Sequence, residues 1–133
     1  MTTDLQNQYC YFFDDTAFEE TDRPGFRRRV ITGDHLQLWF WRIEGGASGS
    51  YLHHHEDSEQ LGIVMRGRLD MRIGAKEDET RVTLGPGELY LAPKGLWHGD
   101  SVFLGDEEYG EVWILDVFSP VRSNLAPTAA PRD

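Results

Sequence analysis

The sequence predicts an all-β fold in which short strands form a sandwich or a barrel. Segments rich in β-branched and aromatic residues recur along most of the chain, and glycines separate them at close intervals. Many short strands at such spacing are typical of β-sandwiches and β-barrels. Almost no segment has the pattern of a helix, and a chain of 133 residues is large enough to bury one core without disulfide bonds.

The first strand is expected at residues 36–43, which contain strong strand formers such as Trp39 and Trp41 and end before Gly45. Further strands are expected at residues 50–55, 61–65, 69–73, 80–84, 88–92, 101–104 and 109–118. Glycine and proline residues lie between these segments and mark the turns.

We expect a single domain over residues 1–125. The first part of this range carries Phe12, Phe13 and Phe18 among acidic residues and is expected to be an arm that packs on the barrel or on a second subunit. Residues 126–133 are small residues, prolines and charges with nothing to bury, so we expect them to be disordered.

Composition excludes several classes of function. With 13 Lys and Arg against 23 Asp and Glu, the net charge of -10 argues against nucleic acid as a partner. No run approaches the ~20 apolar residues of a membrane span. Cys10 is the only cysteine, so no disulfide within the chain is expected, and with no apolar leader we expect a cytoplasmic setting. An acidic substrate would need a local positive centre, which a metal ion with neutral ligands would provide.

A histidine cluster begins at His53, with His54 and His55 directly after it. Successive side chains of a strand point to opposite faces, so His53 and His55 face the same way and His54 faces the other. Two imidazoles can then share one ion. Three adjacent histidines can also be a solvated surface patch, and His54 is best explained in that way.

A second pattern favours a metal site over a surface patch. Gly87, Pro93, Gly95 and His98 follow the spacing G-x5-P-x-G-x2-H, which places a further imidazole on a separate segment. The first pattern reads H-x-H-x4-Q-x6-G and runs from His53 to Gly67. Glu59 also fits an H-x3-E spacing, but the six residues before Gly67 are counted from Gln60.

The two patterns together resemble the motifs of the cupin superfamily, and the resemblance extends over about residues 30–122. It implies a cupin double-stranded β-helix, also called a jelly-roll barrel, with His53, His55, Gln60 and His98 as metal ligands. The chain departs from the family pattern at Ala47 (Gly expected), Gln60 (Glu expected) and Val102 (Asn expected).

A glutamine ligand has a chemical consequence. Three neutral imidazoles and an amide oxygen leave a divalent ion with its full charge, which makes it a stronger Lewis acid. Mixed nitrogen and oxygen ligation suits one divalent transition metal, with Zn, Ni, Fe, Mn and Co all open.

The last expected strand carries further candidates. Alternation places Asp116 and Phe118 on one face, and Arg122 follows Pro120 just beyond the strand. A carboxylate inside an apolar strand is costly unless it is paired or functional. Asp116 can therefore be the partner of an arginine such as Arg42, Arg68 or Arg72 instead, Phe118 an ordinary core residue, and Arg122 a solvated charge.

The segment D-x-F-S-P-x-R resembles the end of the small pectin-degradation cupins, which linearise and ketonise 4,5-unsaturated monouronates. The resemblance implies that Asp116, Phe118 and Arg122 are site residues and that the substrate is a small anionic molecule. On this basis the protein would be an isomerase or lyase of carbohydrate metabolism. In such a site Asp116 would move a proton and Arg122 would bind the carboxylate.

Two other classes of function stay open. The tryptophans Trp39, Trp41 and Trp97 favour a flat apolar substrate, as for a metal-dependent dioxygenase or a polyketide-cyclase-like cupin. The third class is a non-catalytic ligand sensor with a structural metal.

The segment that contains Gln60 also predicts assembly. If Gln60 faces the interior, then Leu61, Ile63 and Met65 lie on the outer face of the sheet. Because a large apolar stripe at a protein surface usually marks an interface, a homodimer is expected.

Overall fold

The computed structural model describes residues 4–122, and these residues form two antiparallel sheets with very little helix. The prediction of an all-β jelly-roll barrel is confirmed. In chain order, the elements are α1 Asp4–Tyr9, the 3-10 helix Asp15–Ala17, β1 Glu19–Glu20, β2 Phe26–Thr32, β3 Gln37–Glu44, β4 Glu59–Arg66, β5 Arg68–Gly74, β6 Arg81–Leu84, β7 Leu89–Ala92, β8 Trp97–Leu104 and β9 Glu111–Ser119.

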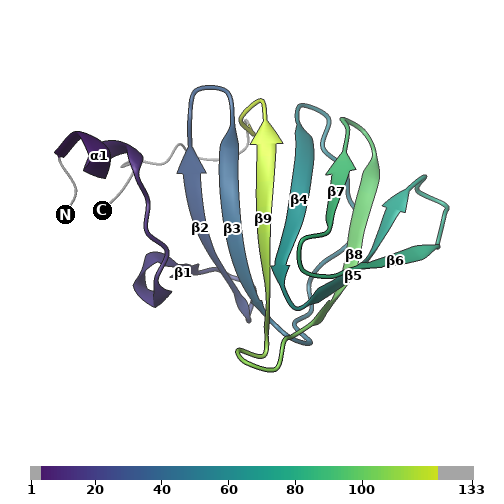
Figure 1. The fold of residues 1–133 in the computed structure, drawn as a ribbon. Coiled ribbons are helices and arrows are strands. Elements are labelled where there is room, and N and C mark those ends of the chain that lie inside the picture. Colours follow the sequence, from purple (N-terminus) through teal and green to yellow (C-terminus); the bar gives the residue numbers. More distant parts are fainter. Residues whose placement is uncertain (1–3, 123–133) are drawn as a thin grey trace.

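The larger sheet has the strand order β1-β2-β3-β9-β4-β7, and the smaller sheet has the order β6-β5-β8. Figure 1 shows β9 in the middle of the larger sheet, between β3 and β4, with β5, β6 and β8 to its right. The last strand of the described residues thus lies between strands that come much earlier in the sequence. This arrangement brings Asp116 of β9 opposite Trp39 of β3 and Gly62 of β4.

Strict alternation along β9 turns every second residue toward the core. Val112, Ile114, Asp116 and Phe118 are buried, and the residues between them are partly exposed. The core is closed by aromatic contacts between the sheets, as between Phe26 and Phe103, whose ring centroids lie 5.5 Å apart. A carboxylate therefore shares its face with three apolar core residues, as the sequence predicts.

One expected strand is wrong, and two observed strands, the short β1 and β2, were not expected. Residues 50–55 form no strand, and only His53 makes an isolated bridge, to His98. Strand β2 was missed because Arg27, Arg28 and Arg29 interrupt its apolar pattern. Arg27 is accommodated by an ion pair of 3.0 Å with Glu111.

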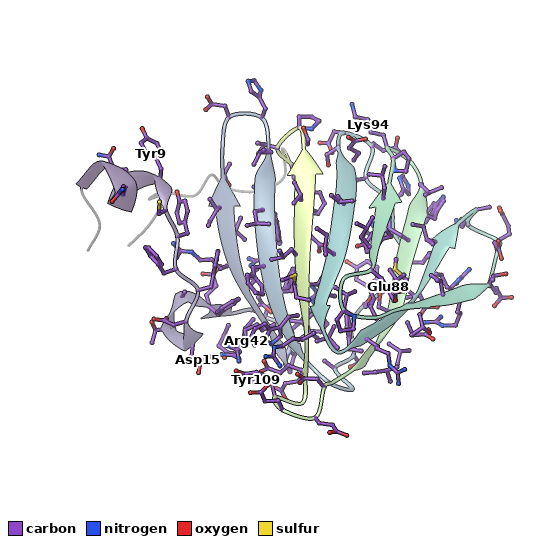
Figure 2. The ribbon with its side chains drawn as sticks, viewed as in Figure 1. Tyr9, Asp15, Arg42, Glu88, Lys94 and Tyr109 are labelled. Carbon is purple, nitrogen blue, oxygen red and sulfur yellow. The ribbon has the colours of Figure 1, made fainter. Side chains whose placement is uncertain are left out.

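The N-terminal arm packs on the barrel of its own chain. The rings of Phe13 and Phe18 each lie 5.1 Å from the ring of Phe40 on β3. Arg42, buried on the same strand, forms an ion pair with Asp15 of the arm. Figure 2 shows Asp15 and Arg42 close together at the lower end of the sheet.

The described residues contain no helix that is long and apolar enough to cross a membrane. The expected disorder of residues 126–133 lies outside the part of the chain that the structure describes.

Candidate metal centre

Three segments bring the four predicted metal ligands together. His53 and His55 lie on the extended segment before β4, Gln60 lies on β4 and His98 lies on β8. Backbone hydrogen bonds join His53 to His98 in both directions, at 2.9 and 2.8 Å. The approach needs Gly99, because a Cβ atom there would lie 2.4 Å from the carbonyl oxygen of Tyr51.

The donor atoms of these residues converge on one point. One ring nitrogen from each of His53, His55 and His98 lies within 4.8 Å of the others. The Oε1 atom of Gln60 lies 3.0 Å from Nε2 of His55 and 3.0 Å from Nε2 of His98. These four residues are thus neighbours in space although the motifs that contain them are far apart in sequence.

Backbone contacts fix which imidazole nitrogen carries the proton. The Nδ1 atom of His53 lies 2.8 Å from the carbonyl oxygen of Tyr51, and that of His98 lies 3.0 Å from the carbonyl oxygen of Leu96. A carbonyl oxygen only accepts, so both Nδ1 atoms donate. The Nε2 lone pairs are then left to face the centre of the cluster.

The environment also keeps the histidines neutral. Burial lowers the pKa of His55 to about 4, and the charge of Arg122 adds to this effect. Burial likewise lowers the pKa of His98 to about 4 and lowers the pKa of His53. At neutral pH each imidazole is therefore uncharged and has one nitrogen with a free lone pair.

Such a set of groups fits a cation. The Gln60 oxygen and Nε2 of His98 are both acceptors, and two acceptors 3.0 Å apart repel one another unless a positive charge lies between them. Two ligands at right angles around one ion, each about 2.1 Å from it, are themselves about 3.0 Å apart. The cluster could therefore hold a divalent metal.

His54 points away from the cluster, as predicted, although residues 50–55 form no strand. Its ring centroid lies 4.3 Å from that of Trp97, and its Nδ1 atom lies 2.8 Å from a carboxylate oxygen of Glu56. Glu59 is exposed whereas Gln60 is buried. The motif spacing thus selected the residue that faces the histidines.

Asp116 is buried beside this cluster. Its Oδ1 atom lies 3.5 Å from the hydroxyl of Tyr90. Burial raises the pKa of Asp116 to about 7, although hydrogen bonds from Gln60, Tyr90 and Trp41 act in the opposite direction. Two of the arginines considered as its partners pair with other acids: Arg42 with Asp15 and Glu111, and Arg72 with Asp100.

Asp116 should make stability depend on pH. Its carboxyl binds a proton more tightly in the folded protein (pKa about 7) than at its ordinary value of 3.8. As pH rises from about 4 to about 7, the unfolded chain releases this proton first, so the folded state loses stability. A tenfold change in proton affinity is about 1.4 kcal/mol, which sets an upper bound of about 4 kcal/mol on the loss.

The matched comparison is with Asp116→Asn, which cannot ionise. Urea unfolding of metal-free protein at pH 4 and pH 8 should show that the change in stability on going to pH 8 is less favourable for wild type than for the variant, because the histidines contribute equally to both proteins. Equal changes in the two proteins would mean that folding does not raise the pKa of Asp116.

Phe118 and Arg122 lie next to the cluster. The ring centroid of Phe118 is 5.3 Å from that of His55. The guanidinium carbon of Arg122 lies 4.9 Å from the Phe118 ring centroid and 5.1 Å from that of Trp39. Arg122 is therefore held over aromatic rings and is not a fully solvated charge.

A cavity of about 770 Å³ contains these residues. Its walls also include Trp39 and Trp41, whose rings lie 5.6 Å apart. Arg23 and Arg28 contribute two further positive charges. Arg28 was not predicted as a site residue, because it lies in strand β2, which was missed.

Tyr90 is another site residue without a motif. It lines the cavity, and its hydroxyl accepts a hydrogen bond of 2.8 Å from Nε2 of Gln60. The one available signal was strand alternation in the expected segment 88–92, which places Tyr90 on the face opposite Leu89 and Leu91.

Comparisons with solved structures agree with this architecture. The chain is similar to KdgF from a Halomonas species, with a TM-score of 0.69 and 24% identity over 86% of this chain and 97% of that one. An RmlC-like cupin from Shewanella frigidimarina gives a TM-score of 0.68 and 22% identity, over 90% of this chain and 99% of the other. At these identities the likeness concerns the fold.

A more distant fold similarity is to the oxalate decarboxylase of Lactobacillus farciminis, with a TM-score of 0.62 and 18% identity over 80% of this chain and 32% of that one. A search of curated proteins gave no significant match.

The family itself is identified from the sequence. A model of the Cupin domain family matches residues 39–114, more than half of the chain. This range contains both histidine motifs and most of the strands that carry the cluster. The chain therefore belongs to the cupin family.

Proposed function

We propose that the protein is a metal-dependent isomerase that ketonises an unsaturated uronate or a similar enol sugar acid. The observation that carries this proposal is the convergence of three neutral imidazoles and the Gln60 oxygen beside a buried carboxyl group, inside one cavity. His53, His55, Gln60 and His98 would hold one divalent transition metal. When bound, the metal supplies a Lewis acid that stabilises negative charge on a substrate oxygen.

Asp116 is suited to proton transfer. An acid or base works best when its pKa lies near the working pH, and burial raises the pKa of Asp116 to about 7. Ketonisation of an enol removes a proton from oxygen and adds one to carbon, so the substrate and the product have the same atoms. Asp116 would carry out one of these proton transfers.

The charges around the cavity favour an anionic substrate. Arg23, Arg28 and Arg122 line it, although the chain has a net charge of -10. The Nε atom of Arg28 is buried without a hydrogen bond and lies 3.5 Å from the exposed Glu19. Arg122 would bind a carboxylate through two parallel hydrogen bonds, and Phe118 would shape the pocket beside it.

The test is an assay of purified, metal-loaded protein with an unsaturated uronate as substrate. The reaction is monitored by the loss of absorbance of the substrate's conjugated double bond. Wild type should accelerate the loss. Arg122→Ala should raise KM about 10- to 100-fold, because hydrogen bonds to charged groups contribute about 1.5–3 kcal/mol. Arg28→Gln should raise KM less, and Lys94→Ala, which removes an exposed charge, should not change it. No acceleration by wild type would rule out this substrate class.

A second candidate is a metal-dependent dioxygenase or a polyketide-cyclase-like enzyme. The observation that favours it is the pair of buried indoles, Trp39 and Trp41, which lie 5.6 Å apart at 32° along the cavity wall and suit a flat apolar substrate. Oxygen consumption with an iron-loaded sample would support the dioxygenase. Ligand binding without turnover would instead indicate a sensor.

We also propose that the protein is a homodimer in the cytoplasm. Gln60, Gly62 and Val64 are buried on β4, whereas Met65 on its outer face is exposed. The outer residues continue onto β7, where Leu89 and Leu91 pair in register with Ile63 and Leu61. Leu89 and Leu91 are about half exposed (50% and 52%), so this apolar patch would be covered in a dimer.

Light scattering at micromolar concentration should give twice the chain mass of 15.2 kDa. Leu91→Arg should reduce the mass to that of a monomer, because it places a charge in the apolar patch. The control Val82→Arg changes another exposed residue, on β6 of the smaller sheet, and should stay dimeric. A monomeric wild type would contradict the proposal.

A further inference from the structure

Tyr90 connects the candidate metal ligands to Asp116. It lies on β7 directly opposite Gly62 of β4. A Cβ atom added at Gly62 would lie 2.3 Å from the Tyr90 ring. The glycine therefore leaves the space that the ring fills, and the ring reaches the cavity that contains the histidines.

The hydroxyl of Tyr90 lies between two polar side chains. It accepts a hydrogen bond from Nε2 of Gln60 at 2.8 Å and faces Oδ1 of Asp116 at 3.5 Å. A hydroxyl has one proton, and the ionised form of Asp116 can only accept. When the proton points to Asp116, only lone pairs are left for Gln60.

This polarity, together with the hydrogen bond that Asp116 accepts from Gln60, decides which end of the Gln60 amide faces the histidines. With its NH2 group toward Tyr90, the amide turns its oxygen toward His55 and His98, at 3.0 Å from each. In the reverse orientation the NH2 group would donate to the two imidazoles. Those hydrogen bonds would occupy the lone pairs that a metal requires.

We propose that Tyr90 is a positioning residue that fixes the Gln60 amide with its oxygen toward the metal, which allows a neutral amide to serve as a ligand. This inference rests on the metal site of the proposed function. An amide has one end that binds a cation and one that does not, whereas the two oxygens of a carboxylate are equivalent. Metal binding by glutamine at position 60 thus depends on Tyr90, whereas metal binding by glutamate at this position would not.

The test is a double-mutant cycle of Tyr90→Phe and Gln60→Glu, with Co²⁺ as the probe. Metal-free proteins are titrated against a competing chelator, and the visible absorption of bound Co²⁺ reports the coordination. Tyr90→Phe keeps the ring beside Gly62 and removes only the hydroxyl. Because residues that orient metal ligands typically contribute 10- to 100-fold to affinity, Tyr90→Phe should weaken Co²⁺ binding by about that factor.

With Glu at position 60, the same Tyr90→Phe change should weaken binding by less than about threefold, the range expected for independent sites. A hydroxyl with a merely structural role would give the same loss in both backgrounds. Tyr109→Phe, a change at an exposed tyrosine, is the control and should leave Co²⁺ affinity and absorption unchanged.

Two outcomes would overturn the inference: unchanged affinity in Tyr90→Phe, or equal losses with Gln and with Glu at position 60. Wild type that binds no Co²⁺ would instead contradict the proposed function itself. If Tyr90→Phe does not fold, NMR of Zn²⁺-loaded wild type gives the answer. Proximity of the Gln60 amide protons to the Tyr90 ring supports the inference, and proximity to the His55 and His98 ring protons contradicts it.

Discussion

Asp116→Asn is expected to lower the turnover of an unsaturated uronate by roughly 10²- to 10⁴-fold, the usual contribution of a positioned acid or base. Asparagine keeps the shape of the side chain and one oxygen that can accept a hydrogen bond, but it cannot transfer a proton. Folding and metal content should therefore be retained. The measurement is the initial rate at saturating substrate with wild-type and variant proteins loaded with the same metal.

The control for this change is Asp34→Asn, which removes an exposed carboxylate from the loop between β2 and β3. It should have the turnover of wild type. If wild type is active and Asp116→Asn is equally active, proton transfer is carried out by another group. The role given to Asp116 would then be wrong, while the uronate activity would stand.

The second large effect is expected for the double variant His55→Ala, His98→Ala. These residues supply two of the four donors, and both lie 3.0 Å from the Gln60 oxygen. Elemental analysis of the purified protein should show about one divalent transition metal per chain in wild type and almost none in the variant.

His54→Ala is the matched control, because His54 is adjacent in sequence but turned toward Trp97 and Glu56. It should keep the metal content of wild type. Unchanged metal in a folded double variant would mean that the ion, if present, is held elsewhere.

The sequence predicted the residues of the cluster better than it predicted the strands that carry them. Motif spacing identified His53, His55 and His98, and the structure brings their nitrogens together. Yet residues 50–55 form no strand. Backbone hydrogen bonds to His98 and the close approach of Tyr51 to Gly99 position His53 in the cluster. These are tertiary contacts, which local strand propensity does not report.

Residues that act through a partner were the hardest to predict. Tyr90 has its role because Gly62 faces it across the sheet, and strand register is not visible in one sequence. Arg28 was missed with β2, whose three consecutive arginines resemble a solvated segment. By contrast, Asp116 and Phe118 were predicted to share a face, because β9 alternates without interruption.

The central claim is that one metal ion binds where three imidazole nitrogens and the Gln60 oxygen converge. Anomalous diffraction from crystals of the metal-loaded protein, measured on both sides of the absorption edge of the metal, tests it most directly. The claim predicts one strong peak per chain, about 2.0–2.2 Å from the ring nitrogens of His53, His55 and His98 and from Oε1 of Gln60. A peak at another position, or no peak here in protein that contains stoichiometric metal, would contradict it.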